Sequence, residues 1–276
     1  MKDKVLVTGA NGQLGTELKK VLPNVLFTDV DTLDITNLDA VKSFVNNNHI
    51  EIIVNCAAYT AVDKAEDEIE LAKKINEDGP LYLALSGAKI LHISTDYVFD
   101  GKNYQPYLPE NVANPLSVYG LTKRAGEIAV LDNAKIALVI RTGWLYSTHG
   151  NNFVKTIRKL GAEKESLDVV VDQIGSPTFA GDLAQAIVNI LPQMNESNKG
   201  IYHYTNEGVC SWFDFATEIM NLSGLVCKVN PIPSSAYPTK AVRPLYSVLS
   251  KEKIKKVFNI EIPHWRESLI KCLKQF

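Results

Sequence analysis

Short apolar runs alternate with longer segments of helical period through the first half of the chain. The apolar runs are rich in Val, Ile and Leu, which is typical of strands buried on both faces of a parallel sheet. They predict strands at 4–8, 25–29, 52–56, 89–94 and 137–141, with helices near 13–22, 37–46, 64–76 and 116–131. Regular strand–helix alternation of this kind predicts an α/β fold, a Rossmann-type doubly wound parallel sheet.

The pattern becomes less regular after about residue 145. Helices are expected near 151–161, 181–191, 211–222 and 264–274, separated by loops with prolines at 231–233 and 237–238 and by strands at 169–171 and 201–204. We therefore predict a dinucleotide-binding Rossmann domain over 1–145. Residues 146–276 are expected to form mainly a smaller α/β substrate-binding lobe, with some segments returning to the Rossmann domain.

Composition narrows the classes of partner. The formal net charge is -2, which gives no support for a nucleic-acid or polybasic membrane partner and favours small molecules. No apolar run approaches the ~18–20 residues of a membrane span, and no targeting segment is evident. The four cysteines and five histidines show no metal-ligand spacing. We expect a soluble, cytoplasmic protein with reduced thiols.

A glycine-rich turn directly follows the first predicted strand and opens the first helix. Its residues are Gly9, Ala10, Asn11, Gly12, Gln13, Leu14 and Gly15. Glycines permit a tight turn and close backbone approach to pyrophosphate, and the helix N-terminus presents free N–H groups to the anion. In this strand–turn–helix context the turn predicts binding of a nicotinamide dinucleotide.

Asp29 ends the second predicted strand, 20 residues after Gly9. An acid at this point hydrogen-bonds the adenosine ribose 2′-hydroxyl and disfavours the additional phosphate of NADP. Residues 28–34 also contain no Arg or Lys that would hold that phosphate. We expect NADH to be usable, and the choice between NADPH and NADH stays open.

Three hydroxyl and amine side chains form the candidate catalytic group. Thr95 ends the fourth predicted strand, and Tyr119 and Lys123 follow on one face of a helix, four residues apart. A phenol is a weak acid at neutral pH, and a nearby ammonium is expected to lower its pKa. Thr95 would hold a substrate carbonyl oxygen where Tyr119 donates its proton, and Lys123 would hydrogen-bond the nicotinamide ribose.

With these residues the chain resembles the dTDP-4-dehydrorhamnose reductase family of the extended short-chain dehydrogenase/reductase superfamily. The resemblance runs through essentially the whole chain. It is carried by residues 9–15, 33–36, 55–63, 94–101, 119–123, 141–144, 150–153, 172–178 and 243–244. The most specific of these are the Ser-Thr-Asp-Tyr-Val-Phe-Asp-Gly run at 94–101 and the Asp-Gln-Ile-Gly-Ser-Pro-Thr run at 172–178.

The resemblance implies a reaction and a set of site residues. The reaction is NAD(P)H-dependent reduction of the 4-keto group of dTDP-4-dehydro-L-rhamnose, the last step of dTDP-L-rhamnose synthesis. Asp34 and Ile35 would lie by the adenine, and Ala57, Ala58 and Tyr59 by the nicotinamide. Trp144 would stack on the deoxysugar, and Arg243 would pair with the diphosphate. The other residues implied at the substrate are Thr60, Val62, Asp96, Asn152 and Phe153, beside Thr95.

Two features depart from the family pattern. Gly143 stands where the family usually has Ser, and the segment 76–94 is about four residues shorter than usual. Four residues are about one helical turn, so the helix face is nearly preserved. We predict a shortened crossover helix without lost chemistry.

Some members of the family pair through a metal held by acids of both subunits. Glu17 and Asp182 are at suitable positions, but the run 264–268 supplies no clear third acid. We predict no metal site, and Mg²⁺-linked pairing is not expected; both a monomer and a homodimer stay open. Two other functions also stay open: another nucleotide-sugar reductase or epimerase, and a non-catalytic regulatory subunit of the methionine adenosyltransferase type.

Overall fold

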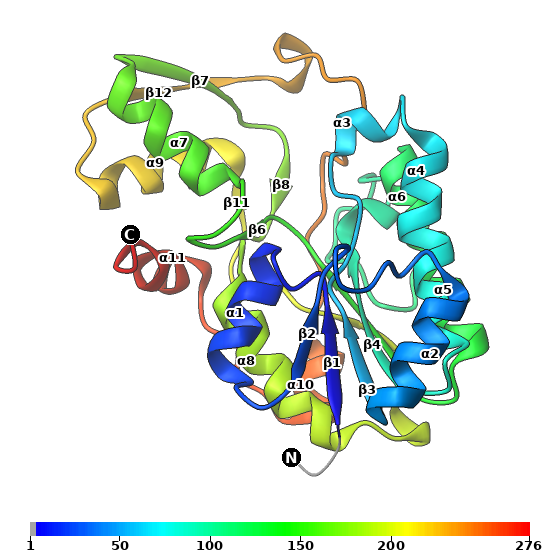
Figure 1. The fold of residues 1–276 in the computed structure, drawn as a ribbon. Helices are drawn as coiled ribbons and strands as arrows, with labels where there is room; N and C mark the ends of the chain where they lie inside the picture. Colours follow the sequence, from blue (N-terminus) through cyan, green and yellow to red (C-terminus); the bar gives the residue numbers. More distant parts are fainter. Residues whose placement is uncertain (1–3) are drawn as a thin grey trace.

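The computed structural model describes residues 4–276 and is built on one parallel sheet (Figure 1). The sheet has six strands in the order β10-β5-β4-β3-β1-β2, and every neighbouring pair is parallel. The strands are β1 (Val5–Thr8), β2 (Leu26–Thr28), β3 (Ile52–Asn55), β4 (Lys89–Thr95), β5 (Ala137–Thr142) and β10 (Gly200–His203). The order reverses between β1 and β3, and such a switch point is where open α/β sheets bind ligands. The predicted Rossmann-type fold is confirmed.

Helices cover both faces of the sheet, because successive strand residues point to opposite sides. Val5 and Val7 pack in one core with the helices of one face, and Leu6 packs in a second core with those of the other. The first face carries α1 (Gln13–Val21), α8 (Ala180–Ile190) and α10 (Glu252–Phe258). The second carries α2 (Leu38–Asn48), α5 (Gly79–Ala84) and α6 (Val118–Asn133). Figure 1 shows α1 and α8 on one side of the strands and α2 and α5 on the other.

The crossover before β4 contains a π-helical turn. After α3 (Val62–Ala65), the chain runs through α4 (Ile69–Lys73), the π-helix η1 (Lys74–Asp78) and α5. The π turn turns Asn76 inward, where its side chain hydrogen-bonds the Tyr59 backbone and the Thr122 hydroxyl. A single helix was predicted over 64–76; in the structure the helical backbone starts earlier, breaks after α3 and continues to Ala84. The strand register on either side of β4 is regular, so the sheet accommodates the short segment.

The second lobe is made of short strand pairs and helices. The pairs are β6 (Leu145–Tyr146) with β9 (Thr178–Phe179), β7 (Ser166–Val170) with β12 (Lys228–Ile232), and β8 (Ile174–Gly175) with β11 (Cys210–Ser211). Its helices are α7 (Phe153–Glu163), α9 (Trp212–Ser223) and α11 (Trp265–Leu273). Short 3-10 turns lie at Asp96–Val98, Leu191–Gln193, Glu196–Asn198 and Ser234–Ala236. After residue 145 the chain returns to the main sheet with α8, β10 and α10. The boundary between the two domains near residue 145 stays a prediction.

The loop predicted at 231–233 is in part a strand. Pro231 and Ile232 belong to β12, which pairs with β7 in a two-stranded sheet. A proline is tolerated there because an edge strand leaves one side of its backbone unpaired.

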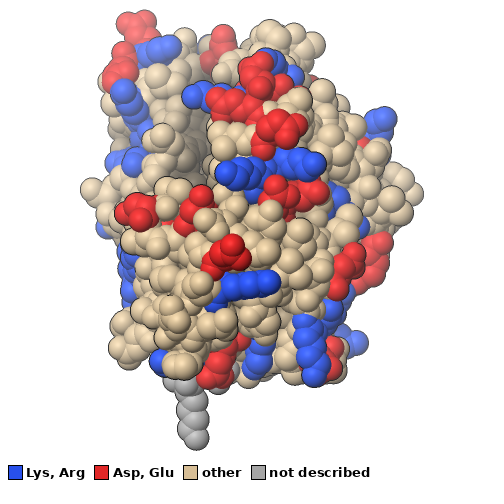
Figure 2. All heavy atoms as spheres, turned by 45° about the vertical axis from the view of Figure 1, so that its right-hand side comes forward, with Lys and Arg blue, Asp and Glu red and all other residues tan. Residues whose placement is uncertain are grey.

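The surface carries mixed charge. Figure 2 shows Lys and Arg side chains interspersed with Asp and Glu over one face of the molecule. Within residues 4–276 no helix is long and apolar enough to cross a membrane.

Candidate active site

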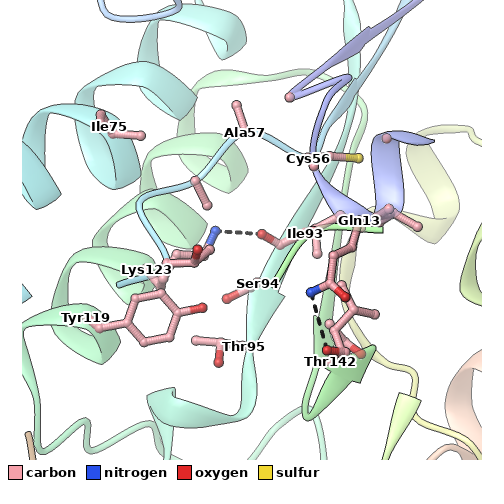
Figure 3. Close-up of a pocket in the computed structure, with 18 of the residues that line it drawn as sticks. Gln13, Cys56, Ala57, Ile75, Ile93, Ser94, Thr95, Tyr119, Lys123 and Thr142 are labelled. Atoms are coloured by element: carbon pink, nitrogen blue, oxygen red, sulfur yellow. Dashed lines mark hydrogen bonds between the residues drawn. The ribbon is translucent and has the colours of Figure 1, made fainter. Parts of the chain in front are cut away.

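A cavity of about 930 Å³ opens at the carboxyl ends of the central strands, between the sheet and the second lobe. Its lining combines the glycine turn, the strand ends and the start of α6. Most of the predicted site residues line it: Gly9, Gly12, Gln13, Leu14, Gly15, Asp29, Asp34, Ile35, Ala57, Ala58, Thr60, Val62, Thr95, Asp96, Tyr119, Lys123, Trp144 and Phe153. Figure 3 shows Thr95, Tyr119 and Lys123 on one side of this cavity and Gln13 across it.

Two glycines of the glycine-rich turn stand where a side chain has no room. Gly9 has a φ of 68°, and a Cβ on it would lie 2.6 Å from the Ala57 nitrogen. A Cβ on Gly15 would lie 2.3 Å from the Gly9 carbonyl oxygen. Gly9 and Gly15 therefore let the turn pack closely against the segment after β3 and against itself, at the N-terminus of α1, a position that suits a pyrophosphate.

Two aspartates border the outer part of the cavity. One carboxylate oxygen of Asp29 accepts a hydrogen bond of 2.8 Å from the Asn11 backbone N–H, which ties β2 to the glycine turn. Asp34 accepts hydrogen bonds from the hydroxyl and backbone N–H of Thr36, and these bonds lower the pKa of its carboxyl. Asp34 is therefore ionised at neutral pH.

The start of α6 places Tyr119 against the end of β4. Ser117 caps the helix by accepting a hydrogen bond from the Gly120 N–H. A Cβ on Gly120 would lie 2.3 Å from the Tyr97 carbonyl oxygen, so glycine allows the helix to begin in contact with the segment after Thr95. The Tyr119 ring also meets Tyr97 edge-on, with 5.5 Å between ring centroids.

Burial raises the pKa of Tyr119 to about 12, partly offset by its interaction with Thr95. The expectation that Lys123 lowers this pKa is not met in this arrangement. The reason is geometric: the Lys123 Nζ donates a 2.6 Å hydrogen bond to the Ile93 carbonyl oxygen, drawn as the dashed line between Lys123 and Ile93 in Figure 3. Tyr119 is therefore protonated at neutral pH, the state a proton donor requires.

Asp96 occupies the space opposite Gly143. A Cβ at position 143 would lie 2.7 Å from the Asp96 carboxylate. Burial raises the pKa of Asp96 to about 6, although Ser247 and Thr95 lower it in part. A side chain at position 143 would therefore require the Asp96 carboxyl to shift.

One face of the Trp144 indole is covered by another tryptophan. Its indole is stacked on that of Trp212, with centroids 3.5 Å apart and planes 7° from parallel. Trp212 lines the cavity and lies 4.5 Å from the Phe153 ring, measured between ring centroids. Sequence reasoning missed Trp212; its place at the start of a predicted helix gave no sign of a partner 68 residues earlier.

Four predicted residues lie behind the lining. The backbone N–H of Asn11 donates to Asp29. The Tyr59 hydroxyl donates to Glu68, and Asn152 caps α7 while its side-chain amide donates to Gln13. Arg243 forms a bidentate ion pair with Asp63, with distances of 2.7 and 3.1 Å. Asn152 therefore connects the glycine turn to the second lobe through Gln13. The positive charge of Arg243 is paired with the Asp63 carboxylate.

The two acids considered for a shared metal are paired within the chain. Glu17 is buried and forms an ion pair of 2.8 Å with Lys20. Asp182 accepts hydrogen bonds from Asn206, Ser268 and Lys271. Residues 4–276 contain no group of three or more His, Cys, Asp or Glu side chains able to hold a metal ion.

The Rossmann sheet, the closely packed glycine turn and the grouping of Thr95, Tyr119 and Lys123 define a member of the short-chain dehydrogenase/reductase class. Comparison with known proteins is more specific. The model of the family described as RmlD substrate binding domain matches residues 2–276. The chain belongs to this family, that of the dTDP-4-dehydrorhamnose reductases.

Individual relatives match over nearly their full length. A spore coat polysaccharide biosynthesis protein, SpsK of Bacillus subtilis, is 42% identical over 99% of this chain and 97% of its own. A dTDP-4-dehydrorhamnose reductase of Aggregatibacter actinomycetemcomitans is 41% identical over 96% of this chain and 97% of its own. The crystal structure of the Bacillus anthracis dTDP-4-dehydrorhamnose reductase in complex with NADP has a TM-score of 0.96 and 39% identity, and all of both chains is covered.

Proposed function

We propose that this protein is a dTDP-4-dehydrorhamnose reductase, which reduces the 4-keto group of dTDP-4-dehydro-L-rhamnose with NADPH or NADH. The observation that carries the proposal is the placement of Thr95, Tyr119 and Lys123 in one cavity with the glycine turn. Similarity to reductases with this name supports the substrate.

The cofactor fits the residues present. The turn from Gly9 to Gly15 would hold the pyrophosphate, and its close packing leaves no room for a Cβ at Gly9 or Gly15. Asp29 would accept a hydrogen bond from the adenosine ribose, Asp34 and Ile35 would border the adenine, and Ala57 and Ala58 would border the nicotinamide. When bound, the nicotinamide supplies the hydride to C4 of the sugar.

The protein's own groups manage the proton. The Thr95 hydroxyl would hydrogen-bond the substrate carbonyl oxygen and hold it by Tyr119. The Tyr119 hydroxyl, kept protonated by burial, would donate its proton to that oxygen as negative charge develops on it. Lys123 would orient the cofactor ribose and stabilise the phenolate left on Tyr119.

The sugar nucleotide would lie toward the second lobe. Thr60, Val62, Asp96 and Phe153 line that part of the cavity, together with the paired indoles of Trp144 and Trp212. Asn152 would act indirectly, through Gln13. Arg243 would reach a diphosphate only by exchanging Asp63 for it, since its guanidinium is bidentate to that carboxylate.

The proposal is tested by following oxidation of NADPH and of NADH with dTDP-4-dehydro-L-rhamnose. Tyr119→Phe removes the proton donor and is expected to lower kcat by roughly 10²–10⁴-fold while NADPH still binds. Tyr146→Phe is the matched control, because Tyr146 is buried in the second lobe away from the cavity. Unchanged turnover in Tyr119→Phe would contradict the mechanism, and a wild type that binds NADPH without turnover would contradict the substrate.

A further inference from the structure

A row of buried polar residues crosses the sheet beneath Lys123. Thr8 of β1 is in register with Asn55 of β3, and Asn55 is in register with His92 of β4. All three side chains are buried, as is Lys123. Polar groups this deep must be hydrogen-bonded to one another, so the direction of each bond is constrained.

The orientation of the Asn55 amide is fixed by its neighbours. The backbone N–H of Ala57 donates to Oδ1 of Asn55 at 3.1 Å. Because a backbone N–H can only donate, the atom that it contacts must be the amide oxygen. The Thr8 hydroxyl donates to the same oxygen at 2.7 Å. The NH₂ group of Asn55 therefore faces Nδ1 of His92 at 3.0 Å and donates to it.

This contact determines the tautomer of His92. A ring nitrogen that accepts a hydrogen bond carries no proton, so Nδ1 is bare. Burial holds the pKa of His92 well below its usual range, so the ring is neutral. Its one proton then lies on Nε2, which faces the Lys123 Nζ at 3.4 Å.

An N–H aimed at Nζ favours a lone pair there over an ammonium proton. The Ile93 carbonyl accepts a second bond from Nζ and holds the amine in place. Burial already lowers the pKa of Lys123 to about 8, and Glu127 and Cys56 oppose this shift. Glu127 is tied to Arg141, burial raises the pKa of the Cys56 thiol to about 12, and Tyr119 is protonated. Among these titratable side chains, His92 is the one whose contact with Nζ is within hydrogen-bond distance.

We propose that His92 is a positioning residue of this enzyme: its Nε2–H, directed by Thr8 and Asn55, holds the Lys123 amine against the sheet before the cofactor binds. The role rests on the proposed function in one respect, that Lys123 serves the cofactor ribose. Lys123 would exchange the His92 and Ile93 contacts for the ribose, and this exchange would favour its protonated form. The affinity for cofactor is therefore coupled to pH through His92.

The tautomer is tested without any turnover. In ¹⁵N-labelled wild-type protein, imidazole correlation spectra are expected to show His92 with a bare Nδ1 and a protonated Nε2 at both acid and alkaline pH. The signal is assigned by its loss in His92→Gln. Asn55→Asp exchanges the donor for an acceptor and is expected to move the proton to Nδ1. A His92 that is protonated at Nδ1 in the wild type overturns the proposal.

The effect on Lys123 is tested by the pH dependence of NADPH binding, measured by quenching of tryptophan fluorescence. Wild-type affinity is expected to fall at alkaline pH as Lys123 loses its proton. His92→Phe keeps the burial but removes the N–H, so the midpoint of this fall moves upward by about one pH unit.

His203→Phe is the matched control, since His203 is buried at the end of β10 and lies outside the cavity lining. Its midpoint should equal that of the wild type, and equal midpoints in all three proteins overturn the proposal. Failure of the proposed function is distinguishable, because it is a loss of sugar turnover and leaves both of these measurements intact.

Discussion

At the scale of single residues, the least expected contact is that between Trp144 and Trp212. Trp144 has a φ of 51°, a left-handed conformation that costs free energy in a residue other than glycine. The stack on Trp212 and a close approach to the Gly175 backbone hold the indole there. The position of Trp144 is therefore set by Trp212 and Gly175, and a substitution at either residue should move the indole in the cavity wall.

Gly175→Ala tests this control of Trp144. The added Cβ would lie 2.7 Å from Cε2 of the indole, so the ring must shift within the cavity wall. A side chain forced about 30° off its rotamer costs ~0.5–1.5 kcal/mol, so KM for the sugar nucleotide should rise about two- to tenfold. The NADPH Kd should stay unchanged, because the glycine turn is not touched. Steady-state kinetics and cofactor titration measure the two quantities.

Gly181→Ala is the control for this change. Its Cβ would meet the Phe179 ring at 2.6 Å, a comparable intrusion at a position outside the cavity lining. An equal rise of KM in both variants would show that general loosening, rather than the position of Trp144, is responsible.

At the scale of elements, a buried ion pair joins the helix that carries Tyr119 to the sheet. Glu127 of α6 is bidentate to Arg141 of β5, with distances of 2.7 Å, and also accepts a hydrogen bond from Ser94 of β4. Burial alone would raise the pKa of Glu127, but Arg141 and the other donors bring it below its usual value. The pair therefore fixes α6 over the two strands that end at the cavity.

Arg141→Gln should be strongly destabilising, because it leaves the Glu127 charge buried without its partner. Breaking a pair of this kind costs about 3–5 kcal/mol, measured as the loss in free energy of unfolding in urea. Lys135→Gln removes an ion pair with Glu196 in which both side chains are largely exposed, and no measurable loss is expected. A small loss in Arg141→Gln, equal to that of Lys135→Gln, would contradict the bracing role.

The sequence predicted the helices and strands better than it predicted which of them lie side by side in the fold. Continuous apolar runs identified the strands, and the run 201–204 was expected as a strand. Its pairing with β5 in the main sheet follows from tertiary packing, which hydrophobic period does not encode. The same holds at the site: Thr8, Asn55 and His92 each occur within a predicted strand, and their alignment depends on register between distant segments.

At the scale of the whole molecule, the sheet buries groups that stay neutral when the unfolded chain would ionise them. His92 on β4 and His203 on β10, with β5 between the two strands, are fully buried. Burial lowers the pKa of His203 to about 3, with Arg141 adding to the effect. In the unfolded chain both rings would titrate at about 6.5. Below that pH the unfolded state binds protons that the folded state refuses, so stability falls as the pH falls.

The buried Asp96 carboxyl changes the free energy of unfolding with pH in the opposite sense to the two histidines. Its pKa is about 6 in the folded protein, against about 3.9 in an unfolded chain, so between these values the folded state holds the additional proton. Between about pH 6 and about pH 5, with the two histidines and Asp96 counted together, the unfolded state binds roughly one proton more than the folded state. The free energy of unfolding should therefore fall by ~1.4 kcal/mol per pH unit in this window.

His203→Gln removes one of the two histidine contributions and should leave the free energy of unfolding nearly flat from about pH 6 to about pH 5. The measurement is urea unfolding followed by tryptophan fluorescence at several pH values in that window. The slope with pH decides the outcome whatever the absolute stability of the variant, because the lost hydrogen bond to the Tyr107 carbonyl oxygen lowers stability equally at each pH. A slope equal to that of the wild type would mean that His203 is protonated in the folded state. The buried, neutral state of the sheet histidines is thus open to measurement through the stability of the entire fold.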